Sequence, residues 1–261
     1  MKLNNIIDEL EKLAPLSLSR EYCEKFGLYD NSGVILNCGK EINKILFSLD
    51  FSVDAVNKAI SGGYNLIITH HPAIFGGIKS INVDVNPLSK KLALCLQNGI
   101  SVVSAHLNLD AAEEGIDYFL MKGMGGTSSE IMDKLSCGGY GRAYAISQTN
   151  FKDLVERTRT QFNTNKLRAY GNENSVIKKV ASFCGSGTDD KALAFAVANG
   201  VDLVVSADMK HHHVAELIER GICVIELTHY ASENFGFTKI AEKLSNRFEI
   251  PCYIHTDKIL L

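Results

Sequence analysis

The sequence predicts an α/β protein built from a duplicated unit. Short apolar runs alternate with segments of helical spacing, a pattern that favours parallel strands joined by helices. Residues 60–68 and 197–205 share one pattern, in which a helix ends at a glycine and a strand follows. Residues 99–103 and 221–225 share the pattern of a later strand. We therefore expect two similar α/β units whose ligand-binding residues lie at the carboxyl ends of the strands of a largely parallel sheet.

The composition is that of an ordinary globular chain. Its 261 residues, 46% of them hydrophobic, can bury a large core, and a net charge of -3 gives no general attraction to nucleic acid or anionic lipid. Seven cysteines without a CxxC pair are typical of reduced core residues. No apolar run approaches a membrane span, so we expect a cytoplasmic protein without signal peptide or transmembrane helix, and no polyanion as its main partner.

The first half of the chain alternates helices with strands. Apolar spacing predicts a helix that Pro15 closes, and Ser17 or Ser19 can cap a second one through Phe26. Ser52 caps a third helix, which ends at a pair of glycines. The remaining expected elements are strands at 34–36, 44–50, 66–69 and 100–106, helices at 53–60 and 89–97, and a loop at 73–87.

The second half begins with residues 121–150, whose glycines indicate a connecting region. A helix with one apolar face follows at 151–162, and the strand 178–183 runs into the glycine-rich turn 184–187. Beyond that turn we expect helices at 191–198 and 214–219 and strands at 203–205 and 222–227.

Two adjacent histidines, His70 and His71, end the buried strand that starts at Leu66. Side chains alternate along a strand, so both imidazoles can reach one site only if the chain leaves the sheet there, and Pro72 favours that exit. Neutral imidazoles on a rigid strand end suit a metal ion. The alternative is a pair of loop histidines without a function.

The second strand of each repeat ends in the pattern His-x-x-x-acid, which pairs His106 with Asp110 and His229 with Glu233. With the adjacent pair, this gives a candidate ligand set of His70, His71, His106, Asp110, His229 and Glu233. Six donors exceed the needs of one tetrahedral ion, whereas two ions that share carboxylates would use them all. The alternative is a helix-terminal hydrogen bond that recurs because the fold recurs.

Six segments, taken together and in order, resemble the motifs of the NIF-three-like proteins, also named GTP cyclohydrolase 1 type 2 homologues. They lie at 29–33, 68–72, 104–110, 184–187, 208–212 and 229–233. The resemblance implies two intertwined three-layer α/β/α units, a dinuclear metal centre and a toroidal homohexamer, a trimer of dimers. The family's metal ligands match the six candidates above. We expect the first unit to comprise residues 1–125 with 235–261, and the second 126–234.

The chain departs from the family pattern at three places beside the candidate site. Tyr29 stands where the family usually has Trp, Ser206-Ala207 replaces Thr-Gly, and Thr228 replaces Gly. None of these replaces a ligand, so the departures bear on pocket shape and substrate preference. His213, where the family often has Asp, is expected to be a solvated residue at a helix start.

Imidazole and carboxylate ligands suit zinc, iron or manganese, and two such ions lower the pKa of a bound water to about 7. We therefore expect hydrolysis by metal-bound hydroxide, which the family name directs at C8 of the guanine of GTP or at another cyclic amide or ester. Candidates for proton transfer or phosphate contact follow the strand equivalent to that of His70, and are Asp208, Lys210, His211 and His212. The alternative for these four is a charged loop and helix start.

The substrate is expected to be a small molecule, with a nucleotide as one candidate, although no complete phosphate-loop or dinucleotide motif is present. No residue is assigned to an organic cofactor. Two other functions stay open. One is a metal-binding ring that binds a partner or nucleic acid without catalysis, and the other is a phosphoesterase or amidohydrolase that uses the same ions.

Overall fold

The computed structural model describes residues 1–260, which form two compact units with ten helices and eleven strands among them. The first unit comprises Met1–Ala112 and Phe237–Asp257, and the second comprises Glu113–Gly236 with residues 258–260. Each unit takes two separate stretches of chain, so the units are intertwined in the sequence. The expected division into residues 1–125 with 235–261 and residues 126–234 stays a prediction.

The first unit contains a five-stranded sheet in the order β1-β4-β3-β2-β11. Its strands are β1 (Gly33–Leu36), β2 (Ile45–Ser48), β3 (Leu66–Thr69), β4 (Ser101–Ser104) and β11 (Cys252–Ile254). Four strands are parallel, and only β1, at one edge, runs antiparallel to its neighbour β4. The expectation of a largely parallel sheet is confirmed for this unit.

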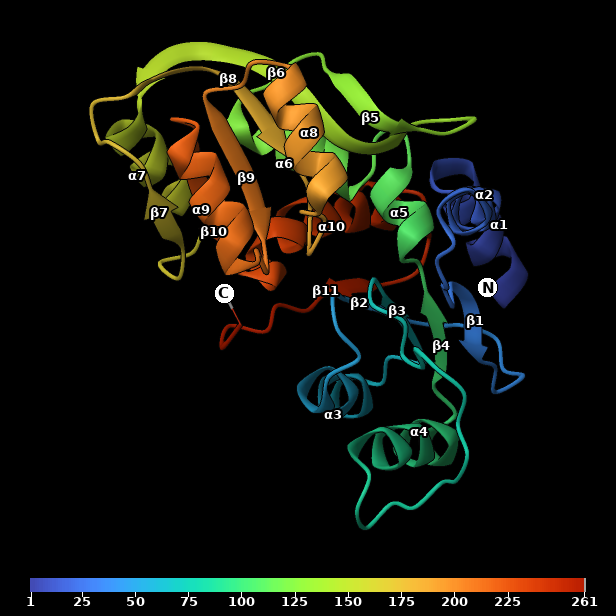
Figure 1. The fold of residues 1–261 in the computed structure, drawn as a ribbon. Coiled ribbons are helices and arrows are strands. Elements are labelled where there is room, and N and C mark those ends of the chain that lie inside the picture. The colour runs from blue at the N-terminus through green and yellow to red at the C-terminus, as the bar shows by residue number, and fades with distance from the viewer. Residues whose placement is uncertain (261) are drawn as a thin grey trace. The chain divides into compact units, whose positions relative to one another are not determined.

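Helices cover this sheet on both sides, and α3 and α4 lie side by side on one face (Figure 1). The helices of the first unit are α1 (Leu3–Leu13), α2 (Leu16–Phe26), α3 (Val53–Gly62), α4 (Pro87–Asn98) and α5 (Leu107–Ala111). As expected, Ser52 caps α3 by accepting a hydrogen bond from the amide of Ala55, and Gly63 ends it in the left-handed region.

The core of the first unit lies between the strands β2, β3 and β4 and the helices α3 and α4. Leu46, Ile67 and Val102 come from neighbouring strands and pack with Val56 and Ala59 of α3 in one buried cluster. All four residues of β2, β3 and β4 are buried, which explains why these strands read as continuous apolar runs instead of alternating ones.

The second unit contains a six-stranded sheet in the order β5-β6-β8-β9-β10-β7. Its strands are β5 (Glu130–Lys134), β6 (Gly139–Asn150), β7 (Arg168–Tyr170), β8 (Val176–Ser182), β9 (Leu203–Ala207) and β10 (Cys223–Leu227). Only β8, β9 and β10 are mutually parallel. The parallel neighbours β9 and β10, joined through a helix, repeat β3 and β4, so the sequence repeat corresponds to a structural one.

Two pairs of helices cover opposite faces of this sheet, α8 with α9 and α6 with α7 (Figure 1). The helices are α6 (Ile116–Met124), α7 (Phe151–Gln161), α8 (Asp190–Ala198), α9 (His211–Glu219) and α10 (His229–Ser245), the last of which continues into the first unit. Among residues 1–260, no helix has the length and apolar composition needed to cross a bilayer.

The expectation of a connecting region at 121–150 is wrong, because most of this segment is the antiparallel hairpin of β5 and β6. Its glycines make the turn and the close packing of that hairpin. Gly138 and Gly139 have positive φ, and a Cβ on Gly139 would lie 2.3 Å from the carbonyl oxygen of Asp133. The glycine cluster indicated a special backbone, not an absence of strands.

A buried ion pair fixes α6 to the sheet of the second unit. Arg142 Nε lies 3.0 Å from Asp117 Oδ2, and both side chains are at most 4% exposed. The same carboxylate accepts hydrogen bonds from the amides of Gly141 and Cys184. The helix α6, the strand β6 and the turn after β8 therefore meet at a fully buried charge that needs all of its partners.

Candidate metal site

The first unit gathers three of the expected ligands at the carboxyl ends of β3 and β4. His70 follows β3, His106 follows β4, and Asp110 lies in α5, one turn later. These three residues each offer one ligand atom within 4.8 Å of the others, and His70 Nε2 lies 3.4 Å from Asp110 Oδ1. Ligand atoms at about 2.0–2.2 Å from a tetrahedral ion lie about 3.3–3.6 Å apart, so this spacing suits coordination.

His71 belongs to the same group of imidazoles. Its ring centroid lies 4.9 Å from that of His70 and 5.9 Å from that of His106. The chain leaves the sheet directly after Thr69, as the proline at position 72 indicated. Within a strand, His70 and His71 would point to opposite faces, but beyond the strand end their rings lie close together.

An oxygen atom accepts a hydrogen bond from the Nδ1 atom of each of these histidines. The distances are 2.9 Å from His70 to the carbonyl of Ala105, 2.7 Å from His71 to Asp50, and 2.8 Å from His106 to Asp30. Carbonyl and carboxylate oxygens only accept, so Nδ1 carries the proton and Nε2 carries the lone pair. Metal-binding histidines are typically oriented in this way by an acceptor on the other nitrogen.

Asp30 is the most strongly anchored of these acceptors. Its side chain is 1% exposed and accepts hydrogen bonds from Ser19 at 2.5 Å, Ser32 at 2.6 Å and His106. Burial raises the pKa of Asp30, but the three hydrogen bonds outweigh it and lower the pKa to about 2. Asp30 is therefore an ionised carboxylate that holds the His106 ring in one orientation.

The second unit carries the other expected pair at the start of α10. His229 and Glu233 are four residues apart on one helical face, with Nε2 and Oε1 3.1 Å apart. Asp208, which follows β9, accepts from His229 Nδ1 at 2.6 Å. This pair thus has the same oriented imidazole as the first unit, and Asp208 supplies the orienting carboxylate.

The backbone of Asp208 has an uncommon conformation, with φ of 48° in the left-handed region. The next amide, that of Met209, donates to Glu226 Oε1 at 3.2 Å, which holds the turn in place. Backbone strain of this kind persists where surrounding contacts determine it and is concentrated at functional sites. Here it aims the Asp208 carboxylate at His229.

The glycine-rich turn 184–187 makes room for the same pair. Gly185 has φ of 57°, and a Cβ at this position would lie 2.3 Å from Glu233 Oε1 and 3.3 Å from the His229 ring. Its amide donates to Ser232 Oγ at 3.0 Å. The motif therefore allows the backbone to pack closely against His229 and Glu233.

The other polar candidates lie at the start of α9, where Lys210 is the capping residue and His211 and His212 are exposed. The expectation of a solvated His213 is wrong. The helix begins at His211 instead of Val214, which turns His213 inward, so it is 1% exposed with Nε2 3.1 Å from Asp190 Oδ1.

Sequence reasoning missed two orienting carboxylates. Asp50 follows β2 at the carboxyl edge of the sheet, so the rule that found the histidines could have found it. Asp30 lies in an irregular turn before β1. The only indication of its importance in the sequence is that it belongs to the family-like segment 29–33. Asp30 is 76 positions from His106 in the sequence, a separation that no local periodicity reveals.

Both groups fit a divalent ion of the zinc, iron(II) or manganese type, because imidazole nitrogens and carboxylate oxygens are their donors. Magnesium and calcium prefer oxygen ligands alone. In the first unit, three possible ligand atoms lie close enough together to hold one ion. In the second unit, an oriented histidine and a carboxylate form a pair that could contribute to such a site.

A cavity of about 430 Å³ lies beside the second group. Its walls include His229 and Asp208 together with Lys166, Arg168 and Glu226. The Arg168 side chain is 74% exposed and lies 3.5 Å from Glu226 Oε2, which is a weak surface contact. The volume suits a small molecule, and the lining carries two cations and two carboxylates, so it offers polar contacts of both charges.

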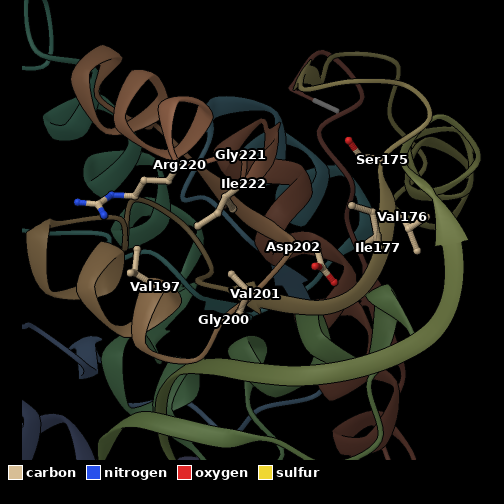
Figure 2. A pocket seen from close by; sticks show the side chains of 10 residues that line it. All are labelled: Ser175, Val176, Ile177, Val197, Gly200, Val201, Asp202, Arg220, Gly221 and Ile222. Carbon is tan, nitrogen blue, oxygen red and sulfur yellow. The ribbon is translucent and has the colours of Figure 1, made fainter.

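A second cavity, of about 670 Å³, lies at the opposite end of this sheet (Figure 2). Its walls include Gly200, Val201 and Asp202, which precede β9, and Gly221 and Ile222, which precede β10. Asp202 accepts from the amides of residues 178 and 179 and so has a structural role. Ligand-binding residues of such sheets gather at the carboxyl ends of the strands, which is where the cavity at His229 lies.

Residues 1–258 match the family model of Duf34/NIF3 (NGG1p interacting factor 3). A GTP cyclohydrolase 1 type 2 homolog of Clostridium perfringens is 32% identical over 254 residues, which cover 95% of this chain and 93% of that protein. Another, from Methanocaldococcus jannaschii, is 30% identical over 252 residues, with 96% and 97% covered.

Solved structures agree with these relatives in fold. The Staphylococcus aureus protein SA1388 has a TM-score of 0.85 at 24% identity, with 98% of this chain and 96% of that chain covered. The reduced HcgD protein of Methanocaldococcus jannaschii has a TM-score of 0.80 at 27% identity, with 97% of both chains covered. The match extends over both units.

Proposed function

Since this chain belongs to the Duf34/NIF3 family, we propose that it is a hydrolase that depends on two divalent metal ions. Zinc, iron and manganese all suit its donors. The proposed ligands are the six residues of the two groups, namely His70, His71, His106, Asp110, His229 and Glu233.

The observation that carries the proposal is that all four histidines are oriented alike. Each has an oxygen acceptor on Nδ1, which leaves the lone pair on Nε2. A histidine with a purely structural role needs no such uniform tautomer, whereas a metal ligand does. The repeated arrangement on β4–α5 and β10–α10 supports a shared chemical purpose.

Bound ions of this type would supply Lewis-acid chemistry and would activate a water molecule for hydrolysis at neutral pH. The protein's own groups would bind and orient the substrate. Lys166 and Arg168 line the cavity beside His229 and would hold a phosphate or another anionic group. The exposed Asp208 carboxylate would orient His229, and Lys210, His211 and His212 are proposed for proton transfer or phosphate contact.

The proposed substrate is a GTP-like nucleotide or another cyclic amide or ester. The names of the relatives support a guanine nucleotide, and the cavity beside His229 offers Lys166 and Arg168 as contacts for its phosphates. Hydrolysis of the guanine ring would release formate, whereas hydrolysis of a phosphoester would release phosphate, so the two reactions can be told apart by product.

A second candidate is a metal-binding ring, assembled as a homohexamer, that binds a partner without catalysis. The loop between β3 and α4 favours it, because Phe75, Ile81 and Val85 are 59%, 62% and 77% exposed. Exposed apolar side chains in one segment are typical of an interaction surface. Light scattering of the purified chain, with and without metal, measures whether such an assembly forms.

The deciding experiment incubates metal-loaded protein with GTP and with a panel of phosphoesters and cyclic amides, while formate and phosphate are measured. We expect product from at least one substrate, and its loss in His106→Ala. Asp8→Asn, which changes an exposed carboxylate on α1, is the matched control and should keep wild-type rates. A metal-loaded protein that is inactive across the panel would instead support the non-catalytic ring.

A further inference from the structure

Three further side chains, none of them among the six proposed ligands, converge in the first unit. His255 directly follows β11, Asp54 lies in the first turn of α3, and Asp257 is the last residue of the unit. One ligand atom of each lies within 4.8 Å of the other two. None of the three has a role in the function proposed above.

Strand geometry brings His255 to α3. The amide of His255 donates to the carbonyl of Phe47 at 2.8 Å, which extends the pairing of β11 with β2 by one residue. Side chains two positions apart share a face, so His255 points to the same side as Tyr253. The Tyr253 ring lies under the Nζ atom of Lys58 on α3, which shows that this side faces the helix.

The imidazole of His255 is buried, and its Nε2 atom lacks a hydrogen bond to any residue that the structure describes. Its side chain is 7% exposed. A buried polar atom in this state is costly unless something else satisfies it. The nitrogen faces two carboxylates, Asp54 Oδ2 at 3.4 Å and Asp257 Oδ1 at 3.7 Å.

These distances suit ligands of one ion better than hydrogen-bonded partners. A charge-assisted N–H···O bond is about 2.7–2.9 Å long, shorter than either contact of His255. Donors at about 2.0–2.2 Å from a tetrahedral zinc ion lie about 3.3–3.6 Å apart, which is close to the observed spacing. Two carboxylates that converge on one imidazole also supply the oxygen donors that such an ion needs.

We propose that His255, Asp54 and Asp257 form a separate binding site for a divalent cation of the zinc type. One nitrogen and two oxygen donors favour zinc or manganese over magnesium and calcium, which prefer oxygen alone. Because Asp54 is 74% exposed, the ion can enter from solvent and keep a water ligand. The site joins the chain after β11 to the start of α3, so its role is to stabilise the first unit.

Zinc titration of the full chain tests this inference. Metal-stripped wild type, Asp54→Asn, Asp257→Asn and the control Asp8→Asn are titrated with zinc chloride by calorimetry, and melting temperatures are measured with and without zinc. We expect Asp54→Asn and Asp257→Asn each to weaken one zinc site more than about tenfold, with the remaining sites unchanged. Asp54 is exposed, so its variant will fold even if a change at His255 does not.

A His106→Ala background separates this site from the proposed catalytic ions. In that background the chain should still bind zinc, with a rise in melting temperature that Asp54→Asn reduces. Identical zinc binding by wild type and Asp54→Asn would overturn the inference. A difference in stability between the two proteins that depends on pH but not on zinc would also overturn it, because it indicates that a protonated His255 pairs with the carboxylates. Failure of the GTP assay leaves these readouts unaffected.

Discussion

Replacing Asp30 by Asn should destabilise the metal-free chain by an amount that depends on pH. The buried carboxylate accepts hydrogen bonds from Ser19, Ser32 and His106, and its pKa falls from 3.8 to about 2. Each pKa unit corresponds to about 1.4 kcal/mol, so the ionised Asp30 stabilises the folded chain by about 2 kcal/mol at pH 7. Asn has the same shape but no charge, so Asp30→Asn loses this contribution.

The sign of the pH dependence follows from the lowered pKa. A carboxylate that binds protons more weakly in the folded state contributes its full stability above pH 4 and loses it as the pH falls toward 2. Near pH 3 the difference between wild type and Asp30→Asn should already be smaller by about 1 kcal/mol than at pH 7. Asp8→Asn, on the exposed face of α1, should show neither the loss nor the pH dependence.

Urea unfolding of chelator-treated protein between pH 3 and pH 7 measures these free energies. The same variant, titrated with zinc at pH 7, should also bind metal about 10–100-fold more weakly, because His106 loses the acceptor that fixes its orientation. A constant difference in unfolding free energy across this pH range would refute the assignment of Asp30 as a charged acceptor. Unchanged zinc affinity would refute its orienting role.

Three further predictions concern the second unit. Asp208→Asn should weaken metal binding about 10–100-fold with little change in melting temperature, measured by zinc titration, and an equal affinity would contradict its contact with His229. Gly185→Ala should lower the unfolding free energy by about 1–2 kcal/mol, since φ is positive, and unchanged urea unfolding would contradict this. Asp117→Ala should lower the unfolding free energy by about 3–5 kcal/mol, because the charge of Arg142 stays buried without its partner. Replacing Asp117 and Arg142 together by apolar residues should restore much of this unfolding free energy, measured by the same urea unfolding.

Local signals in the sequence predicted most of the elements that carry the candidate site. The apolar run from Leu66 and its proline exit located the end of β3, and Ser52 with Gly63 located both ends of α3. The repeat predicted that β9 and β10 are equivalent to β3 and β4. These features depend on neighbours within a few residues, which is why sequence reasoning reached them.

The errors arose where a local signal had two structural meanings. Glycines indicate a connection or a tight hairpin, and only the pairing of β5 with β6 distinguishes the two. His213 lies in a run of three histidines that looked solvated, yet its position on the inward face of α9 depends on where that helix begins.

The sequence by itself determined the chemical type of the candidate site and the strand and helix ends where its histidines and carboxylates occur, because residue identity and hydrophobic period are properties of the chain. Only the tertiary structure decided which oxygen holds each Nδ1, and hence which nitrogen can coordinate. The acceptors of His70, His71 and His106 come from positions 35, 21 and 76 residues away. Such pairs form because packing of the sheet brings distant turns together, and no pattern within one segment records them.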